Sequence, residues 1–214
     1  MQKVRYVNSG RSMIEMIGVL SIMAVLSVGG LAGYTKMMSQ YRINKSVEQI
    51  TNMASRISAI GSQSSSYDGL SNQSAVKFNA IPSEVVVGNG TNLKNPFGGA
   101  VRISPSSMYS GGSDTLAYTI TYTDLPEEAC VALGAHDWAH GSNMALIGVG
   151  VAPSESSADM AATKLYQNCA GESGSGYVAA CTNGTSVKIP LSVSLAAQIC
   201  ECGNDGCAIV LKYF

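Results

Sequence analysis

The sequence is poor in charged residues, which make up 13% of its 214 positions and leave a formal net charge of −1. A nucleic-acid surface needs a clustered excess of Lys and Arg, so no nucleic-acid partner is expected. Cysteine is absent from the first 129 residues. With no thiol near the N-terminal apolar run, a lipoprotein anchor is excluded. The length suits one domain with a core plus an extension.

An uncharged run follows the N-terminus and extends from Met16 to Tyr34, nineteen residues in all. A helix of about 20 apolar residues is long enough to cross a bilayer. Lys3, Arg5 and Arg11 precede the run, and positive charge on that side favours a cytoplasmic N-terminus. The sequence therefore predicts one membrane-spanning helix.

Glu15 stands at the start of this run, where a carboxylate is costly and needs a partner. A cleaved secretory signal would need a small-residue site, and Leu31-Ala32-Gly33 is a poor one. A plain signal anchor leaves Glu15 unexplained. Cleavage after Gly10 would instead make Arg11 the new N-terminus. In a helical stack of subunits, Glu15 could then pair with the new amino group of a neighbour and fix the register, or with the Arg11 guanidinium of its own helix.

The helix is expected to continue, from about Ser12 to Ile60. Its second half, residues 35–61, is amphipathic, with apolar residues at three- and four-residue spacing that need a sheet to cover them: Ile43, Val47, Ile50, Met53 or Ala54, Ile57 and Ile60. No proline interrupts the helix, so a kink would have to come from Gly29, Gly30 and Gly33. These glycines indicate either close helix packing or a segment that unwinds on assembly.

Residues 62–214 are expected to form a globular head of loops and short strands. Strands are predicted at Val85–Val87 and Ala100–Ser104, with a hairpin loop at 110–114. The next strand alternates, placing Leu116, Tyr118, Ile120 and Tyr122 on one face, and a helix then begins at Leu125-Pro126-Glu127-Glu128. The final segment, "CAIVLKYF", is predicted to be a central strand.

All six cysteines lie in the C-terminal half: Cys130, Cys169, Cys181, Cys200, Cys202 and Cys207. An even count behind a membrane-directing segment favours disulfides in an oxidising compartment. Cys169 and Cys181 could close a Gly/Ser-rich loop. A zinc site is less favoured because the spacing of Cys200, Cys202 and Cys207 lacks paired C-x2-C motifs.

The stretch "HDWAH" places His136 and His140 four residues apart, but no third ligand or general base accompanies them. We expect a surface turn in which Trp138 packs inward; the alternative is an exposed binding patch around Trp138. No catalytic constellation is found, so neither an enzyme nor a cofactor is expected.

The stretch "GRSMIEMIGVLSIMAVLSVGGLAGY" resembles the class III signal of type IV pilins and the related pseudopilins. The resemblance implies a leader at 1–10, cleavage between Gly10 and Arg11 by a prepilin peptidase, and an assembly role for Glu15 in the helix of residues 11–34. Arg11 departs from the family, which usually has an apolar, N-methylated residue there.

The stretches "NPFGGAVRIS" and "LPEEACVAL" further resemble the head of type IVb pilins. This resemblance implies an α+β fold with a long N-terminal helix packed on an antiparallel sheet. It also implies that Cys130 pairs with Cys200 or Cys202, which would leave the other for Cys207.

The function that this resemblance implies is a structural subunit of a helical filament of like subunits. The chain would wait in the inner membrane and would be moved to a surface pilus by an assembly platform and motor. The alternatives are a pseudopilin of a type II secretion system and a signal-anchored surface binding protein that does not assemble.

Overall fold

The computed structural model describes residues 13–88, 90, 92–107, 114–138, 146–153, 164–167, 189–203 and 206–214. The chain divides into two compact units, an N-terminal unit (Met1–Tyr41) and a C-terminal unit (Arg42–Phe214). Helix α1 (Met13–Gly61) supplies residues to both units. The predicted long helix is therefore confirmed within one residue at each end, and its last twenty residues belong to the C-terminal unit.

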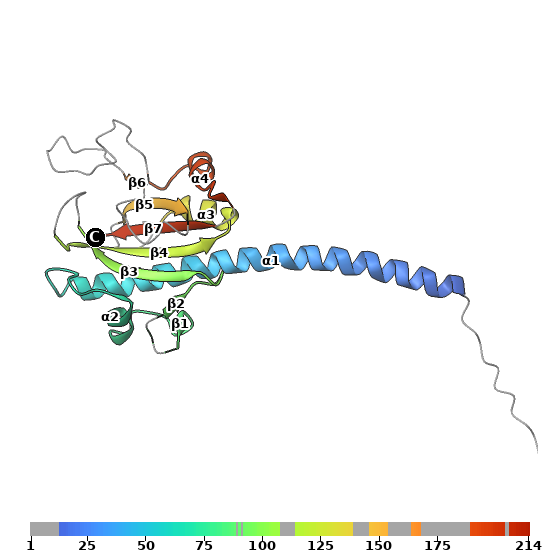
Figure 1. The fold of residues 1–214 in the computed structure, drawn as a ribbon, viewed down its shortest axis with the longest axis horizontal. Coiled ribbons are helices and arrows are strands. Elements are labelled where there is room, and N and C mark those ends of the chain that lie inside the picture. Colours follow the sequence, from blue (N-terminus) through green and yellow to red (C-terminus); the bar gives the residue numbers. More distant parts are fainter. Residues whose placement is uncertain are drawn as a thin grey trace, which may run out of the picture. The chain divides into compact units, whose positions relative to one another are not determined.

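Within the C-terminal unit, α1 buries the predicted apolar stripe. Ile43, Ile50, Met53, Ala54 and Ile57 are buried, while Val47 and Ile60 pack against the same core from its margin. Figure 1 shows this half of α1 running along a face of the sheet. The prediction that a sheet covers the apolar stripe of the amphipathic half is thus confirmed.

The sheet has seven strands in the order β1-β2-β3-β4-β7-β5-β6, and every neighbouring pair is antiparallel. The bounds of its strands are β1 Val86–Val87, β2 Asn92–Lys94, β3 Ala100–Ser106, β4 Ala117–Leu125, β5 Leu146–Pro153, β6 Lys164–Gln167 and β7 Cys207–Tyr213. The α+β class with an antiparallel sheet is confirmed. As predicted, the last strand is central: β7 lies between β4 and β5.

Strand β4 contacts α1 through tyrosine hydroxyl groups as well as through its core side chains. Tyr118 donates a hydrogen bond of 2.9 Å to the carbonyl oxygen of Ala54, and Tyr122 donates one of 3.4 Å to Oε1 of Gln49. Burial raises the pKa of both tyrosines, so they stay protonated and remain donors. These bonds hold the C-terminal third of α1 against the sheet.

The alternation predicted for this strand is only partly right. Tyr118, Ile120 and Tyr122 are fully buried toward α1, but Leu116 precedes β4 and is 40% exposed, so its inclusion was wrong. The opposite face is buried too, since Thr119 and Thr121 are nearly inaccessible. β4 is therefore covered on both faces, unlike a half-buried strand.

Three further helices complete the described part of the C-terminal unit. The predicted helix after Leu125 is α3 (Glu127–Gly134), with Pro126 at its N-cap. Two short helices were not predicted: α2 (Asn72–Lys77), which begins with a capping box between Ser71 and Ser74, and α4 (Val193–Ile199). Most of the expected 110–114 hairpin loop lies outside the described residues, but β3 and β4 do form the antiparallel pair that it would join.

Asn95 anchors the turn that precedes β3. The side chain is buried, and its Oδ1 accepts hydrogen bonds from the backbone nitrogens of Phe97 and Gly99, at 2.9 and 3.0 Å. Its Nδ2 donates to the carbonyl oxygen of Thr123, at 2.7 Å. One amide thus satisfies two donors of its own turn and one acceptor of β4.

Substituting Asn95→Ala is expected to lower the free energy of unfolding by about 2–3 kcal/mol, because three backbone groups, two of them in buried hydrogen bonds, lose their partner. Denaturant unfolding in detergent, followed by the fluorescence of the single tryptophan, Trp138, measures the change. Asn95→Asp keeps both acceptor bonds but sets a carboxylate oxygen against the Thr123 carbonyl. It should also destabilise the fold, and a neutral result for both variants contradicts the assignment.

Candidate functional site

The predicted cleavage residues, Gly10 and Arg11, lie outside the described residues. Glu15 lies in the first turn of α1, where a carboxylate is favoured by the positive end of the helix dipole. Its side chain is exposed. The acidic residue that the sequence singles out is therefore presented at the start of the helix.

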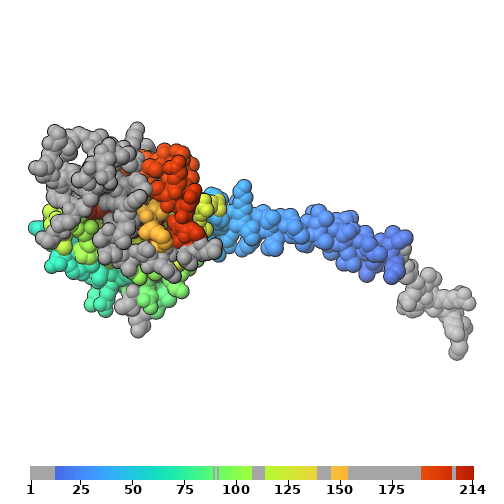
Figure 2. Space-filling view, turned by 45° about the horizontal axis from the view of Figure 1, so that its top comes forward, coloured from blue at the N-terminus to red at the C-terminus, as the bar shows by residue number. Residues whose placement is uncertain are grey.

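The described part of the N-terminal unit exposes an apolar surface. Ile14 is 81% exposed and Val25 is 73% exposed, and the same holds for large apolar residues around the helix. Figure 2 shows the side chains of this segment, in blue, on the molecular surface. Among the described residues, α1 is the one helix long and apolar enough to cross a membrane by length and composition.

The four glycines of this segment are not required by contacts within the described chain. A Cβ added at Gly18, Gly29, Gly30 or Gly33 would meet nothing within 4 Å. Glycine nevertheless weakens a helix interior by roughly 1 kcal/mol relative to alanine. Close packing by another molecule and local unwinding on assembly therefore both stay predictions for these glycines.

A charged contact fixes the part of α1 at the start of the C-terminal unit. Lys45 Nζ lies 2.7 Å from Glu84 and 3.1 Å from Glu48, and Gln49 Nε2 donates to Glu84 at 3.3 Å. The hydrogen bond from Lys45 lowers the pKa of the Glu84 carboxyl, with a smaller contribution from Gln49. Gln49 also accepts a hydrogen bond from the Tyr122 hydroxyl group. This polar cluster therefore joins α1 to β4 and to the segment before β1. The sequence offered no signal for Glu84, because the contact spans 35 positions or more.

Four of the six cysteines lie within the described residues, and none of the four is free. Cys130, on α3, is joined to Cys200, at the end of α4, with Cα atoms 5.9 Å apart. Cys202 is joined to Cys207, the first residue of β7, with Cα atoms 5.2 Å apart. Of the two pairings left open for Cys130, the structure has the one to Cys200. The predicted Cys169–Cys181 bridge lies outside the described residues.

The segment after α3 packs Trp138 inward, and the alternative of an exposed Trp138 patch is wrong. Trp138 is 4% exposed, and its Nε1 donates to the Leu133 carbonyl oxygen at 3.0 Å. The ring of His136 meets it edge-on, with ring centroids 4.6 Å apart. His140 lies outside the described residues.

Partial burial lowers the pKa of His136 below its ordinary value of 6.5, and Asp137 opposes this shift. The unfolded chain therefore binds this proton more tightly than the folded chain. We expect stability to be complete above about pH 6.5 and to fall on acidification from pH 7.5 to 5.5. The loss should be under about 1 kcal/mol because the ring is partly exposed and solvent screens the charge. Denaturant unfolding at the two pH values should show a smaller drop for His136→Gln than for the unmodified chain; an equal drop would contradict this prediction.

Comparison with known proteins places these features in a family. A family model described as PilS N terminal matches residues 40–203, more than half of the chain. The chain belongs to this family. The predicted membership among the pilins is thereby confirmed. The matched residues include five of the six cysteines, all but Cys207, and they begin after the apolar part of α1.

The chain is also similar to the major structural subunit of the bundle-forming pilus from Escherichia coli O127:H6 (strain E2348/69 / EPEC) and from Escherichia coli O111:H-. Each is 26% identical over 124 residues, which is 58% of this chain. The match spans 62% of the length of these curated relatives. Among solved structures, a type IV b pilin from Salmonella typhi is similar with a TM-score of 0.44 and 16% identity; the match covers 77% of this chain and 96% of that one.

Proposed function

We propose that the chain is a structural subunit of a type IV pilus-like filament, cleaved after Gly10 and assembled through α1. The observation that carries this proposal is the apolar side-chain surface exposed by α1 from Met13 to Tyr34. Membership in the PilS N-terminal family and the similarity to bundle-forming pilus subunits support it.

The exposed surface needs a partner because apolar area of this extent is unstable in water. Its side chains are apolar on all sides of the helix rather than on one stripe, so a single covering sheet would not satisfy it. Two environments surround a helix completely: a bilayer and a bundle of like helices. The chain would use both in turn, first the inner membrane with its N-terminus in the cytoplasm, and then the centre of a surface filament.

Glu15 would fix the position of each subunit relative to its neighbour in the filament. Its carboxylate is carried at the start of an apolar helix, and burying it without an opposite charge would be costly. Cleavage by a prepilin peptidase creates an amino group at Arg11, which a neighbouring subunit's Glu15 can neutralise when the two are correctly staggered. An assembly platform and motor would supply the work of extraction from the membrane.

The intact mass of the protein in membranes and in the sheared surface fraction tests the proposal. We expect a chain that begins at Arg11 and is recovered from the sheared fraction; an additional 14 Da, the mass of one methylene unit, would show N-methylation, as the pilin resemblance implies. A mass that includes residues 1–10, with none of the protein in the sheared fraction, would overturn the proposal and favour a signal-anchored binding protein.

A further inference from the structure

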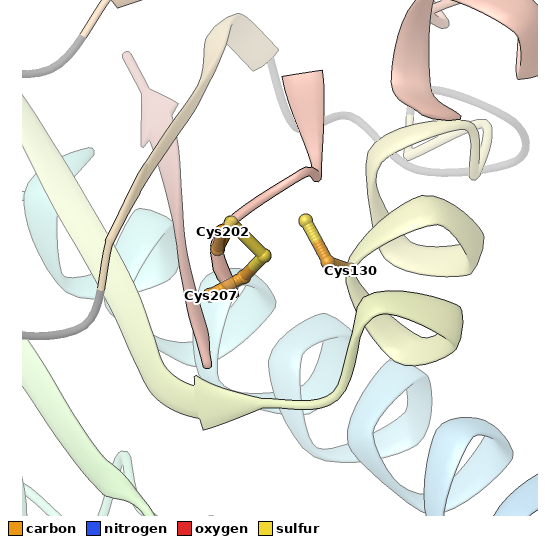
Figure 3. Close-up of side chains that lie close together, drawn as sticks. All are labelled: Cys130, Cys202 and Cys207. Carbon is orange, nitrogen blue, oxygen red and sulfur yellow. A yellow bond between two sulfur atoms is a disulfide. The ribbon is translucent and has the colours of Figure 1, made fainter. Parts of the chain in front are cut away.

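Two disulfides lie side by side in the C-terminal unit. The Sγ atoms of Cys130, Cys202 and Cys207 all lie within 4.8 Å of one another, although Cys130 is bonded to Cys200 and not to either of them. Figure 3 shows the Cys130 side chain extending from α3 toward the Cys202–Cys207 bridge. The bridge between α3 and α4 therefore presents one sulfur directly to the second bridge.

Access to these sulfurs is unequal. Cys130, Cys200 and Cys207 are buried, while Cys202 is half-buried and has exposed neighbours on both sides, Glu201 and Gly203. Cys207 Sγ also lies 3.2 Å from the Cys200 carbonyl oxygen, which would accept a hydrogen bond from the thiol in the reduced chain. Among the four described cysteines, Cys202 is therefore the one that a dissolved oxidant or reductant can reach, and it is the better placed of its pair to react as a thiolate.

We propose that Cys202 and Cys207 form a thiol–disulfide exchange site through which the buried Cys130–Cys200 bridge is oxidised. This assignment is independent of filament assembly. It concerns how a chain that has folded around reduced cysteines completes its disulfides.

The exchange begins at Cys202. Its thiolate attacks a small disulfide oxidant, RSSR, and releases one thiolate RS⁻. Cys207 then attacks the mixed disulfide at Cys202 and releases the second, which completes the Cys202–Cys207 bond.

The buried pair is oxidised by transfer. The Cys130 thiolate attacks one sulfur of the Cys202–Cys207 bond, which breaks and leaves a thiolate on the other. The Cys200 thiolate next attacks Cys130, which forms Cys130–Cys200 and returns both residues of the exchange site to thiols. A second RSSR reoxidises the exchange site, so four thiols and two RSSR give two protein disulfides and four RSH.

Cys200→Ser in the full chain, held in detergent, isolates the transfer step. This substitution leaves Cys130 as a thiol facing an intact Cys202–Cys207 bridge. At pH 8 we expect the disulfide to move, so that peptide mapping finds Cys130 bonded to Cys202 or Cys207. A maleimide added to the native protein should then label Cys202 in molecules where Cys130 is bonded to Cys207; where Cys130 is bonded to Cys202, the freed Cys207 is buried and is labelled only after unfolding. The matched control is Cys130→Ser, which frees Cys200, the cysteine outside the group of three; it should exchange at least tenfold more slowly.

The proposal is overturned if Cys200→Ser keeps its Cys202–Cys207 bond while only Cys130 remains reduced. Wild-type kinetics give a second test that does not depend on that variant. With glutathione disulfide as the oxidant, the double variant Cys202→Ser/Cys207→Ser should form Cys130–Cys200 at least tenfold more slowly than the wild type under native conditions, but equally fast in denaturant, where burial no longer limits access. Equal rates under native conditions would overturn it.

Discussion

Replacing Glu15 with glutamine is expected to reduce the protein in the sheared surface fraction at least tenfold while leaving the membrane pool unchanged. The amide keeps the shape of the side chain but cannot neutralise the amino group of a neighbouring subunit. Each interface in the filament would then bury one uncompensated charge, and breaking a buried pair in this way costs about 3–5 kcal/mol. Quantitative immunoblotting of the two fractions measures the effect.

The matched control is Glu48→Gln, at the other acidic position of α1, where the side chain is 60% exposed and contacts Lys45. This variant should be recovered from the sheared surface fraction in the same amount as the unmodified protein. Arg11→Met separates the two partners considered for Glu15, because it removes the guanidinium and keeps the new amino group. If the amino group is the partner, this variant assembles. If Glu15→Gln is recovered from the sheared fraction in the normal amount, another contact fixes the position of neighbouring subunits.

Gly99→Ala is expected to unfold the C-terminal unit or to lower its free energy of unfolding by about 3 kcal/mol or more. A Cβ at Gly99 would lie 2.6 Å from the carbonyl carbon of Thr123 and 2.9 Å from the Cβ of Asp124, and closer still to the Thr123 carbonyl oxygen. The obstruction is mostly backbone, so no side-chain rotation relieves it. The turn held by Asn95 would have to separate from β4.

Gly98→Asn is the control in the same turn. Gly98 has a φ of +96°, and an added Cβ would meet nothing within 4 Å. Asparagine tolerates positive φ better than other side chains, so this variant should lose at most about 1 kcal/mol. Denaturant unfolding of the two variants by Trp138 fluorescence compares them directly. If alanine at Gly99 costs no more than asparagine at Gly98, the close approach to β4 is not what requires glycine.

The long helix could be predicted nearly to its ends because its signals are local. An uncharged run, a regular apolar stripe and the absence of proline all lie within the segment itself. The central position of β7 and the helix carrying Cys130 could also be predicted, since a run of apolar residues such as Cys207–Leu211 and a proline at a helix start are short-range patterns. The residues Asn-Pro-Phe-Gly-Gly are typical of a turn, but they carry no signal that the Asn95 amide holds β4.

What could not be predicted depends on distant contacts. Helix α4 has seven residues, too few for a periodic signal, and its end is held by the bond from Cys200 to α3. Cys200 and Cys202 are two positions apart, so spacing alone could not show which of them pairs with Cys130. The structure places Cys200, buried at the end of α4, in that bond. The burial of both faces of β4 follows from the way other segments cover the sheet, which alternation along one strand does not reveal.

The central place of the last strand also determines when the sheet can close during synthesis. β7 (Cys207–Tyr213) pairs with β4 on one side and β5 on the other. Until β7 has been synthesised and has paired, β4 and β5 each present an unpaired edge to any strand they meet. A chain that stops before Cys207 would lack β7, together with the partner of Cys202. A copy that lacks β7 therefore cannot form the middle of the sheet, and its β4 and β5 edges would be open to pairing with another chain.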